Sequence, residues 1–258
     1  MVEVQAIPAF RDNYIWLIVG EGESPAVAIV DPGDAGPVLR VLAERGLVPT
    51  TLLITHHHSD HVGGVDELCA RYPLTVYGPA GERVPRLSHP LREGDTVALP
   101  GLPVFGVSDV PGHTAGHIAY HGGGLLFCGD TLFAGGCGRL FEGTAAQMHA
   151  SLQKLAALPA DTLVYCAHEY TLGNLRFALT VEPDNRTLQT RYQTTEDLRR
   201  HGLPTVPATL GLERDTNPFL RCDIPAVAAA ASRHAGQLRQ PGVETFATVR
   251  GWKDHWNG

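Results

Sequence analysis

The ten residues from Thr55 to Gly64, THHHSDHVGG, decide what kind of protein this is. They hold four histidines and one aspartate within six consecutive positions, directly after the apolar run 52–54, which we predict to be a buried strand. If the extended backbone continues past this strand, His56 and His58 point to one side and His57 to the other. Imidazole nitrogens and carboxylate oxygens are ligands that zinc and similar divalent metals take. The stretch therefore predicts a metal site at the end of a strand.

The same arrangement recurs farther along the chain. Apolar runs at 104–107, 125–128 and 162–166 are predicted strands, and a residue able to bind a metal follows each of them. Strand ends are where α/β proteins tend to place their chemistry. The predicted ligands are a first set of His56, His58 and His113, a second set of Asp60, His61 and His168, and Asp130, which is suited to bridging two metals.

Two metals held roughly 3.5–4 Å apart can share a hydroxide and clamp an attacked carbonyl group. The pKa of the bound water then falls toward roughly 7, which yields a nucleophile at neutral pH. We expect Asp60 to orient this hydroxide and Asp130 to hold both metals, so both aspartates are predicted to be catalytic. Zinc is the expected metal, although histidine and aspartate also suit iron and manganese.

Composition limits the class of protein. The 258 residues are long enough for one large domain, or for a large domain with a smaller companion. The net charge is −7 with histidine neutral, and no basic run occurs, which argues against a nucleic-acid partner. No apolar run approaches the length needed to cross a membrane.

The N-terminus and the cysteines bear on location. Glu3 lies near the start of the chain and no apolar segment follows it, so no signal peptide is predicted. The five cysteines are scattered and no C-x-x-C occurs, which indicates neither a disulfide framework nor a thiolate metal site. We therefore expect a protein of a reducing compartment, the cytoplasm.

Element patterns predict an α/β (α+β) fold of two packed sheets with helices outside. Strands are expected at 14–19, 26–30, 74–77 and 96–99, and helices at 36–45 and 63–71. Beyond residue 169 the pattern becomes helical, with helices expected at 171–181, 187–201, 224–235 and 242–256, and with 203–221 as an extended connection. The predicted domains are a catalytic domain at 1–169 and a helical, substrate-binding domain at 170–258.

Several motifs carry a resemblance to a known family. The segments T-H-H-H-S-D-H, G-H-T-A-G-H, G-D-T-L-F and A-H-E-Y are similar to those of the metallo-β-lactamase superfamily, which has an αββα fold. Further segments and the helical C-terminal part narrow the resemblance to the hydroxyacylglutathione hydrolases, or glyoxalase II. These segments lie at 10–14, 135–139, 141–144, 181–183 and 217–221.

The resemblance implies hydrolysis of a glutathione thioester of a 2-hydroxy acid, typically S-D-lactoylglutathione, in methylglyoxal detoxification. It also implies that Arg250 and Lys253 hold the glycine carboxylate of glutathione, and that Arg139 and Tyr170 make further contacts. One departure is Phe141, where some members of the family have tyrosine, so one hydroxyl contact to glutathione is absent.

Helical geometry independently places the two cations on the inner side of the last helix. At about 100° per residue, Val243, Phe246 and Val249 share one broad apolar face, and Arg250 and Lys253 fall within it. The alternative is that both side chains extend outward and complement the helix C-terminus.

Other residues near the motifs have simpler interpretations. We interpret His117 as structural, His57 as a supporting residue and Cys137 as a packing residue, because no paired base for a catalytic cysteine is evident. Asp31 suits either an acceptor for a metal-bound histidine or ordinary turn chemistry.

Three other functions compete with thioester hydrolysis. The same fold could support a persulfide dioxygenase, a lactonase or a β-lactamase; the acidic charge argues against RNA processing; and the full ligand set argues against a non-catalytic scaffold. The expected partner is a small-molecule thioester, with neither nucleic acid nor membrane, and the chain is expected to be a monomer or a small homo-oligomer.

Overall fold

A computed structural model describes residues 2–23 and 25–256. The chain divides into two compact units and passes from one to the other three times. The first unit runs to Asp109 and includes Ala115–Gly129, whereas the second contains Val110–Thr114 and everything from Asp130 onward.

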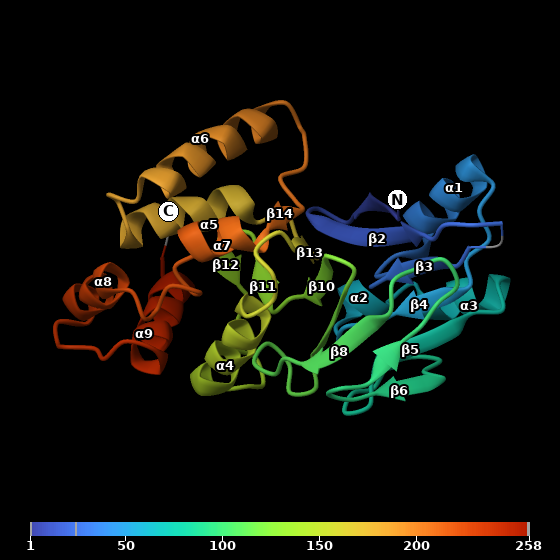
Figure 1. The fold of residues 1–258 in the computed structure, drawn as a ribbon, viewed down its shortest axis with the longest axis horizontal. Coiled ribbons are helices and arrows are strands. Elements are labelled where there is room, and N and C mark those ends of the chain that lie inside the picture. The colour runs from blue at the N-terminus through green and yellow to red at the C-terminus, as the bar shows by residue number, and fades with distance from the viewer. Residues whose placement is uncertain (1, 24, 257–258) are drawn as a thin grey trace. The chain divides into compact units, whose positions relative to one another are not determined.

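The first unit contains two sheets (Figure 1). One sheet has the strand order β1-β2-β3-β4-β5-β6, in which β1–β3 are antiparallel neighbours and β3–β6 are parallel neighbours. In the other, β7, β8, β9 and β10 pair in that order, all antiparallel. The strands are β1 (Glu3–Ala9), β2 (Asn13–Val19), β3 (Val27–Val30), β4 (Thr51–Leu53), β5 (Thr75–Pro79), β6 (His89–Leu91), β7 (Thr96–Val97), β8 (Phe105–Asp109), β9 (Ile118–Gly122) and β10 (Leu125–Gly129).

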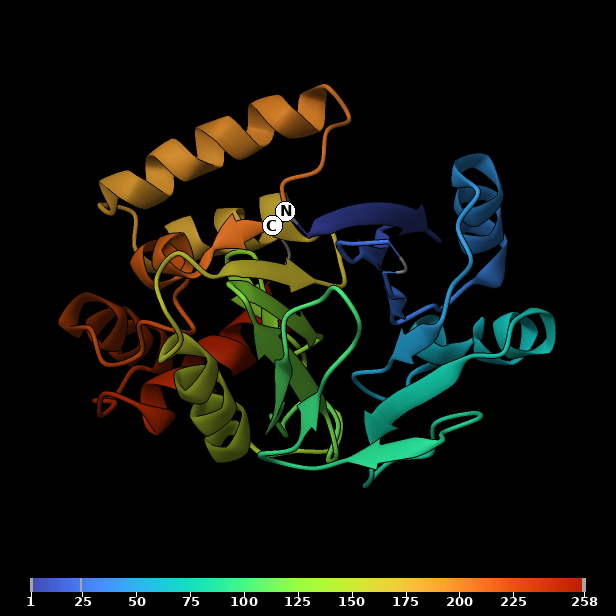
Figure 2. The same ribbon diagram turned by 45° about the vertical axis from the view of Figure 1, so that its right-hand side comes forward.

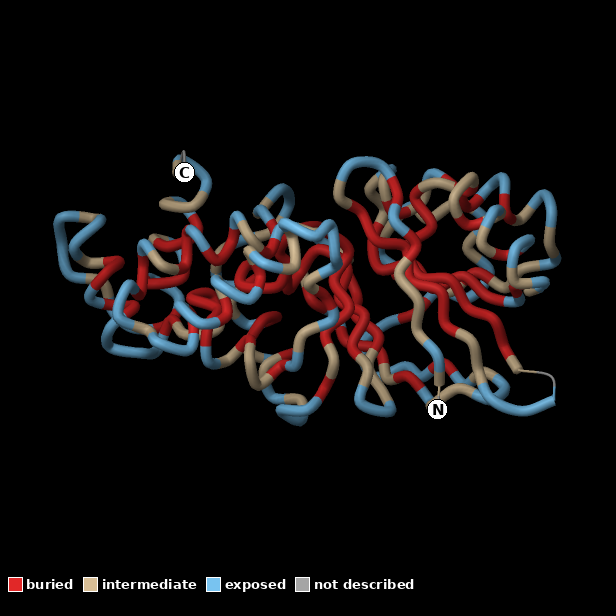
Figure 3. The backbone as a smooth tube through the Cα atoms, turned by 90° about the horizontal axis from the view of Figure 1, so that it is seen from above, coloured by how far each residue is buried: buried red, intermediate tan, exposed pale blue. Residues whose placement is uncertain are grey.

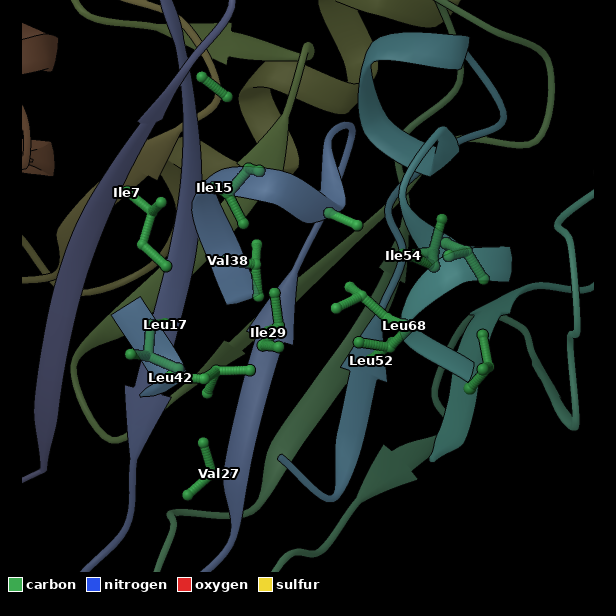
Figure 4. Packing of buried hydrophobic residues seen from close by; sticks show 14 residues of the cluster. Ile7, Ile15, Leu17, Val27, Ile29, Val38, Leu42, Leu52, Ile54 and Leu68 are labelled. Atoms are coloured by element: carbon green, nitrogen blue, oxygen red, sulfur yellow. The ribbon is translucent and has the colours of Figure 1, made fainter. Parts of the chain in front are cut away.

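Helices α1 (Ala35–Arg45) and α3 (Val65–Arg71) cover one face of the first sheet (Figures 2 and 4). Helix α1 begins where the Asp34 side chain accepts a hydrogen bond from the Gly36 amide, and it ends at Gly46, whose left-handed backbone suits glycine. Its buried side chains Val38 and Leu42 pack against strand residues such as Leu17 and Ile29. This apolar layer holds the strands from which the histidine-rich loop emerges.

The two sheets of this unit contact each other beside that loop. Tyr120 of β9 donates a hydrogen bond from its hydroxyl to the carbonyl oxygen of Ile54 at 2.9 Å, and the Ile118 amide donates to the carbonyl oxygen of Thr55 at 3.0 Å. Burial of the Tyr120 hydroxyl raises its pKa well above the ordinary value, so it remains a neutral donor.

Strand backbones are largely buried, and exposed residues concentrate in the connections (Figure 3).

The chain after β4 differs from the single helix predicted at 63–71. A one-turn helix, α2 (Ser59–Val62), precedes α3, so Asp60 and His61 lie on a helical turn. The Gly63 amide donates to the Ser59 carbonyl, and the Gly64 amide donates to the carbonyl of Pro32, which ends the turn against the loop after β3.

The second unit is mainly helical (Figure 1). Helix α5 packs against α6, and α9 packs against α4 and α8. Two short antiparallel strand pairs, β11–β12 and β13–β14, complete it. The elements are β11 (Leu132–Phe133), β12 (Gly136–Cys137), α4 (Ala145–Ala156), β13 (Leu163–Cys166), α5 (Thr171–Val181), α6 (Arg186–Arg200), β14 (Ala208–Thr209), α7 (Leu210–Thr216), α8 (Pro225–Ala235) and α9 (Val243–Asp254).

The prediction that 203–221 is an extended connection is wrong, because the segment contains β14 and α7. Thr209 begins α7 by accepting a hydrogen bond from the Leu212 amide, and the helix brings Glu213 into the interior. The buried Glu213 carboxylate accepts hydrogen bonds from the Arg191 guanidinium of α6 and from the Gly135 amide. Glu213 thereby ties the β11–β12 hairpin to the helices.

None of the helices in the described part of the chain combines the length and the apolar character needed to cross a membrane.

Replacing Leu42 by alanine tests the packing of α1 on the sheet. Leu42 is fully buried, so Leu42→Ala should lower the free energy of unfolding by about 2–5 kcal/mol. Denaturant unfolding followed by circular dichroism measures the change. The matched control is Leu238→Ala, because Leu238 is 77% exposed and its loss should cost less than about 0.5 kcal/mol. Equal effects of the two substitutions would contradict this account of the core.

Candidate active site

Asp31, directly after β3, organises the histidine-rich loop of the first unit. Its buried carboxylate accepts hydrogen bonds from the Thr55 amide at 2.8 Å and the Thr55 hydroxyl at 2.7 Å, and it lies 3.0 Å from Nδ1 of His61. Its backbone is left-handed with φ 49°, a conformation that favours glycine and that other residues adopt at a cost in free energy. Of the two interpretations of Asp31, the structure favours the acceptor for a histidine, because the carboxylate fixes the His61 ring.

Asp60 is held in place by a close backbone contact with Gly33 and by a hydrogen bond from the Asn13 side chain. A Cβ atom on Gly33 would lie 1.8 Å from the Asp60 carbonyl oxygen, so only glycine lets the loop after β3 pass beneath α2. The Asn13 side chain at the start of β2 donates a hydrogen bond to Oδ2 of Asp60 at 3.0 Å, and Nε2 of His61 lies 3.6 Å from the same oxygen. The family-like segment at 10–14 thus contains a residue that orients the predicted catalytic aspartate.

His56 and His58 come together as their spacing predicts. Nε2 of His56 lies 3.1 Å from Nδ1 of His58. His117 stacks on His56 with ring centroids 4.6 Å apart, and its own Nδ1 lies 3.0 Å from the Ile118 carbonyl oxygen. The stack supports the interpretation of His117 as a structural residue that packs behind His56.

His57 contacts Glu82, a residue for which the sequence offers no signal. The buried Glu82 carboxylate accepts a hydrogen bond from the His57 amide at 2.6 Å, lies 2.9 Å from His57 Nδ1, and accepts a hydrogen bond from the Gly116 amide at 3.0 Å. This contact is consistent with a supporting role for His57, and Glu82 joins the histidine-rich loop to the G-H-T-A-G-H segment.

In the second unit, Asp130 lies between two histidines. Its Oδ2 is 3.4 Å from Nε2 of His113, and its Oδ1 is 3.4 Å from Nε2 of His168. All three side chains are buried. Nδ1 of His113 lies 2.9 Å from the backbone oxygen of Arg139 and donates to it, which leaves Nε2 with its lone pair toward Asp130.

The β11–β12 hairpin and its flanks position these predicted ligands. A Cβ atom on Gly138 would lie 2.0 Å from the Asp130 carbonyl oxygen, so the chain can fold back over Asp130 only with glycine at that position. The ring of Tyr170 stacks on His168 at 4.7 Å with an interplanar angle of 6°, and Phe133 meets both rings edge-on. Phe141 packs edge-on against His113 at 5.2 Å.

The predicted substrate-binding cations lie at the end of α9. Arg250 is buried and donates hydrogen bonds from Nη1 to the Cys137 carbonyl oxygen and from Nη2 to Asp254, both at 3.0 Å. Its guanidinium also lies 5.1 Å from the centre of the Phe219 ring. Arg250 therefore points inward, as the helical geometry predicts.

Lys253 lies against aromatic rings of the same unit. Its Nζ donates to the Gly173 carbonyl oxygen at 3.3 Å and lies 5.1 Å and 5.0 Å from the ring centres of Phe177 and Trp256. Burial, and then the charge of Arg250, lower the pKa of Lys253 to about 8. The side chain of Arg139 is two-thirds exposed, and its Nε lies 3.7 Å from Asp254.

Cys137 is buried beside Arg250, with its Sγ 3.7 Å from Nη1. Burial raises the pKa of this thiol to about 11, because the thiolate would lose its hydration. These surroundings suit a packing residue.

The spacing of the predicted ligand atoms suits tetrahedral coordination of a divalent metal ion such as zinc. Ligand atoms about 2.0–2.1 Å from zinc are about 3.3–3.4 Å apart when the geometry is tetrahedral. The four separations within the units are 3.1 Å between the nitrogens of His56 and His58, 3.6 Å between His61 and Asp60, and 3.4 Å from each oxygen of Asp130 to its histidine. The residues present therefore fit divalent metal ions.

Comparison with known proteins assigns the chain to a family. Residues 9–168 match the metallo-β-lactamase superfamily, and residues 169–256 match the C-terminal region of hydroxyacylglutathione hydrolase. The hydroxyacylglutathione hydrolase of Alkalilimnicola ehrlichii is 59% identical, covering 98% of this chain and 99% of that one. That of Nitrosomonas eutropha is 52% identical, covering 99% of this chain and 100% of that one.

Solved structures share the fold. ETHE1 from Myxococcus xanthus is 25% identical with a TM-score of 0.65 over 98% of both chains. The di-iron-bound form of TTHA1623 is 31% identical with a TM-score of 0.56, covering 81% of this chain and 95% of that one. The predicted metallo-β-lactamase fold with a helical C-terminal region is thus confirmed. With both family matches and full-length relatives above half identity, the chain belongs to the hydroxyacylglutathione hydrolases, enzymes of the metallo-β-lactamase superfamily.

Proposed function

We propose that this enzyme hydrolyses S-(2-hydroxyacyl)glutathione thioesters, typically S-D-lactoylglutathione, to glutathione and a 2-hydroxy acid such as D-lactate, in methylglyoxal detoxification. The observation that carries the proposal is the match to hydroxyacylglutathione hydrolases along the whole chain, including their C-terminal region. Steady-state hydrolysis of lactoylglutathione by the purified protein tests it, with a lactone and a β-lactam as alternative substrates. Faster turnover of either alternative would overturn the proposal.

We propose a metal centre built from seven histidine and aspartate side chains. Its support is the preorganised pair of histidines in the first unit and the carboxylate of Asp130 between two histidines in the second. Zinc is the proposed metal, and iron and manganese suit the same donors. The proposed ligands are His56, His58 and His113 for one ion and Asp60, His61 and His168 for the other, with Asp130 shared.

Metal ions bound there would polarise the thioester carbonyl and lower the pKa of water, which is the chemistry they supply in such sites. The protein contributes orientation. Asn13 holds the Asp60 carboxylate, which we propose aligns the attacking water by a hydrogen bond. Asp31 and the Arg139 carbonyl fix the rings of His61 and His113. The leaving group is a thiolate, stable enough near neutral pH that no dedicated acid is needed.

We propose that Arg139, Tyr170, Arg250 and Lys253 bind the glutathione part of the substrate. The cations among them gather around the end of α9, and the glycine carboxylate of glutathione has the complementary charge. Residues 170–258 would then form the glutathione-binding domain and 1–169 the catalytic domain. A monomer or a small homo-oligomer in the cytoplasm completes the proposal.

Changing the shared carboxylate tests the metal centre. Asp130→Asn keeps the side-chain volume but removes the charge, so we expect metal content to fall from about two ions per chain and kcat/KM to fall by about 100-fold or more. Elemental analysis and kinetics on one batch measure both. The control Asp161→Asn removes the same charge from an exposed residue and should change neither value. Full activity with a single bound ion in the unaltered enzyme would contradict the two-metal proposal.

Paired substitutions of adjacent histidines test the ligand assignment. His58→Ala should lose a metal ligand and most activity, whereas His57→Ala should retain most activity, because Glu82 would still accept hydrogen bonds from the His57 and Gly116 amides. Metal content and kcat distinguish the two variants. If His57 proved as essential as His58, the assignment would be wrong.

The lowered pKa of Lys253 predicts a pH dependence of substrate binding. Below about pH 8 the ammonium is charged and attracts the glycine carboxylate, and above it the charge is lost. We expect KM for lactoylglutathione to rise roughly tenfold from pH 7 to pH 9, which follows the charged fraction of the group. Initial rates corrected for spontaneous hydrolysis give KM at each pH.

Two variants of Lys253 serve as the controls for this rise. Lys253→Met should raise KM at pH 7 and flatten its dependence on pH, because no titrating amine remains. Lys253→Arg should keep the low KM up to pH 9, since arginine stays charged. An unchanged rise in Lys253→Met would mean that another group titrates.

A further inference from the structure

Asp254 places a carboxylate among the cations at the end of α9. Its Oδ1 accepts a hydrogen bond from Nη2 of Arg250 at 3.0 Å and lies 3.7 Å from Nε of Arg139. Lys253 is its neighbour in the sequence. The side chain of Asp254 is 35% exposed, whereas that of Arg250 is 5% exposed, so the carboxylate lies between a buried guanidinium and solvent.

Helix stability does not explain an acidic residue at this position. Asp254 is the last residue of α9, where the helix dipole disfavours negative charge. Its ion pair with Arg250 also has the cation N-terminal to the acid at i and i+4, the less favourable order. Residues that oppose local preferences in this way are concentrated at functional sites.

We propose that Asp254 determines how tightly the enzyme holds glutathione, by keeping a resident carboxylate in the corner that receives the glycine carboxylate. The inference rests on the proposed function, because it takes Arg139, Arg250 and Lys253 as the glutathione-binding cations. Asp254 neutralises one of the three positive charges and occupies Nη2 of Arg250. The carboxylate of the ligand must therefore enter beside a like charge.

This repulsion acts on substrate and product alike. Glutathione carries the same glycine carboxylate before and after the thioester is cleaved, and that group is remote from the scissile bond. An interaction that substrate and product share changes the affinity for both without changing the rate of the chemical step. Tight binding would therefore slow the release of glutathione. Asp254 thus weakens both complexes and favours release of glutathione.

The test replaces Asp254 by asparagine, which keeps an oxygen to accept the Arg250 hydrogen bond and removes the charge. Two like charges about 5–6 Å apart repel enough to change affinity about threefold in a water-like dielectric, and up to about 100-fold where the surroundings exclude water. We expect Asp254→Asn to lower the Kd for glutathione, measured by calorimetry, and the KM for lactoylglutathione by the same factor. Glutathione esterified at its glycine carboxylate should bind both forms equally.

Asp161→Asn provides the control for net charge and should leave the Kd for glutathione unchanged. An unchanged or raised Kd in Asp254→Asn would overturn the inference. The role of Asp254 would then be only to hold the Arg250 side chain in place. A lower Kd for the ester as well would also overturn it, because the effect would not depend on the carboxylate. If the unaltered enzyme neither bound glutathione nor cleaved its thioester, the proposed function itself would fail, which separates the two failures.

Discussion

The contact between Asp31 and the loop at Thr55–His61 is the interaction on which the candidate site residues of the first unit depend. One carboxylate, in a strained left-handed backbone, accepts hydrogen bonds from the Thr55 amide and hydroxyl and faces the His61 ring. It therefore fixes both the direction in which the chain leaves β4 and the orientation of the His61 ring, which lies one helical turn later. The buried apolar layer under α1 and α3 keeps the Asp31 strand and the Thr55 strand in register.

The candidate site residues of the second unit are held by the same kind of contact with different groups. A backbone oxygen, that of Arg139, fixes His113, and the segment that carries this oxygen follows a hairpin tied to α6 and α7 through Glu213. A buried carboxylate thus stabilises the frame in each unit, and each is satisfied by several donors, as buried charges require. Hydrogen bonds and ring stacking therefore already hold several of the predicted ligands in place.

Local patterns predict much of this molecule. The apolar periodicity at 171–181 predicts α5, and the spacing of His56 and His58 predicts their convergence. The sequence also contains a signal for the start of helix α4, because Thr144 and Gln147 form a capping box. The contact of Glu82 with His57, 25 residues away, has no such signal, because only the folded sheet brings the two together. The helix within 203–221 is likewise hidden, because its buried side chains, Leu210, Glu213 and Thr216, do not form an apolar stripe, and the partners of Glu213 are distant in the sequence.

The buried position of Cys137 has a consequence for redox chemistry. Thiol–disulfide exchange proceeds through the thiolate, and a thiol with a pKa of about 11 is ionised to roughly one part in 10⁴ at neutral pH. Cys137 also contacts Arg250, so it lies at the place where we propose that glutathione binds. An exposed cysteine there would form mixed disulfides with oxidised glutathione. Burial therefore keeps Cys137 from exchanging with oxidised glutathione at the place where we propose that the glycine end of glutathione binds.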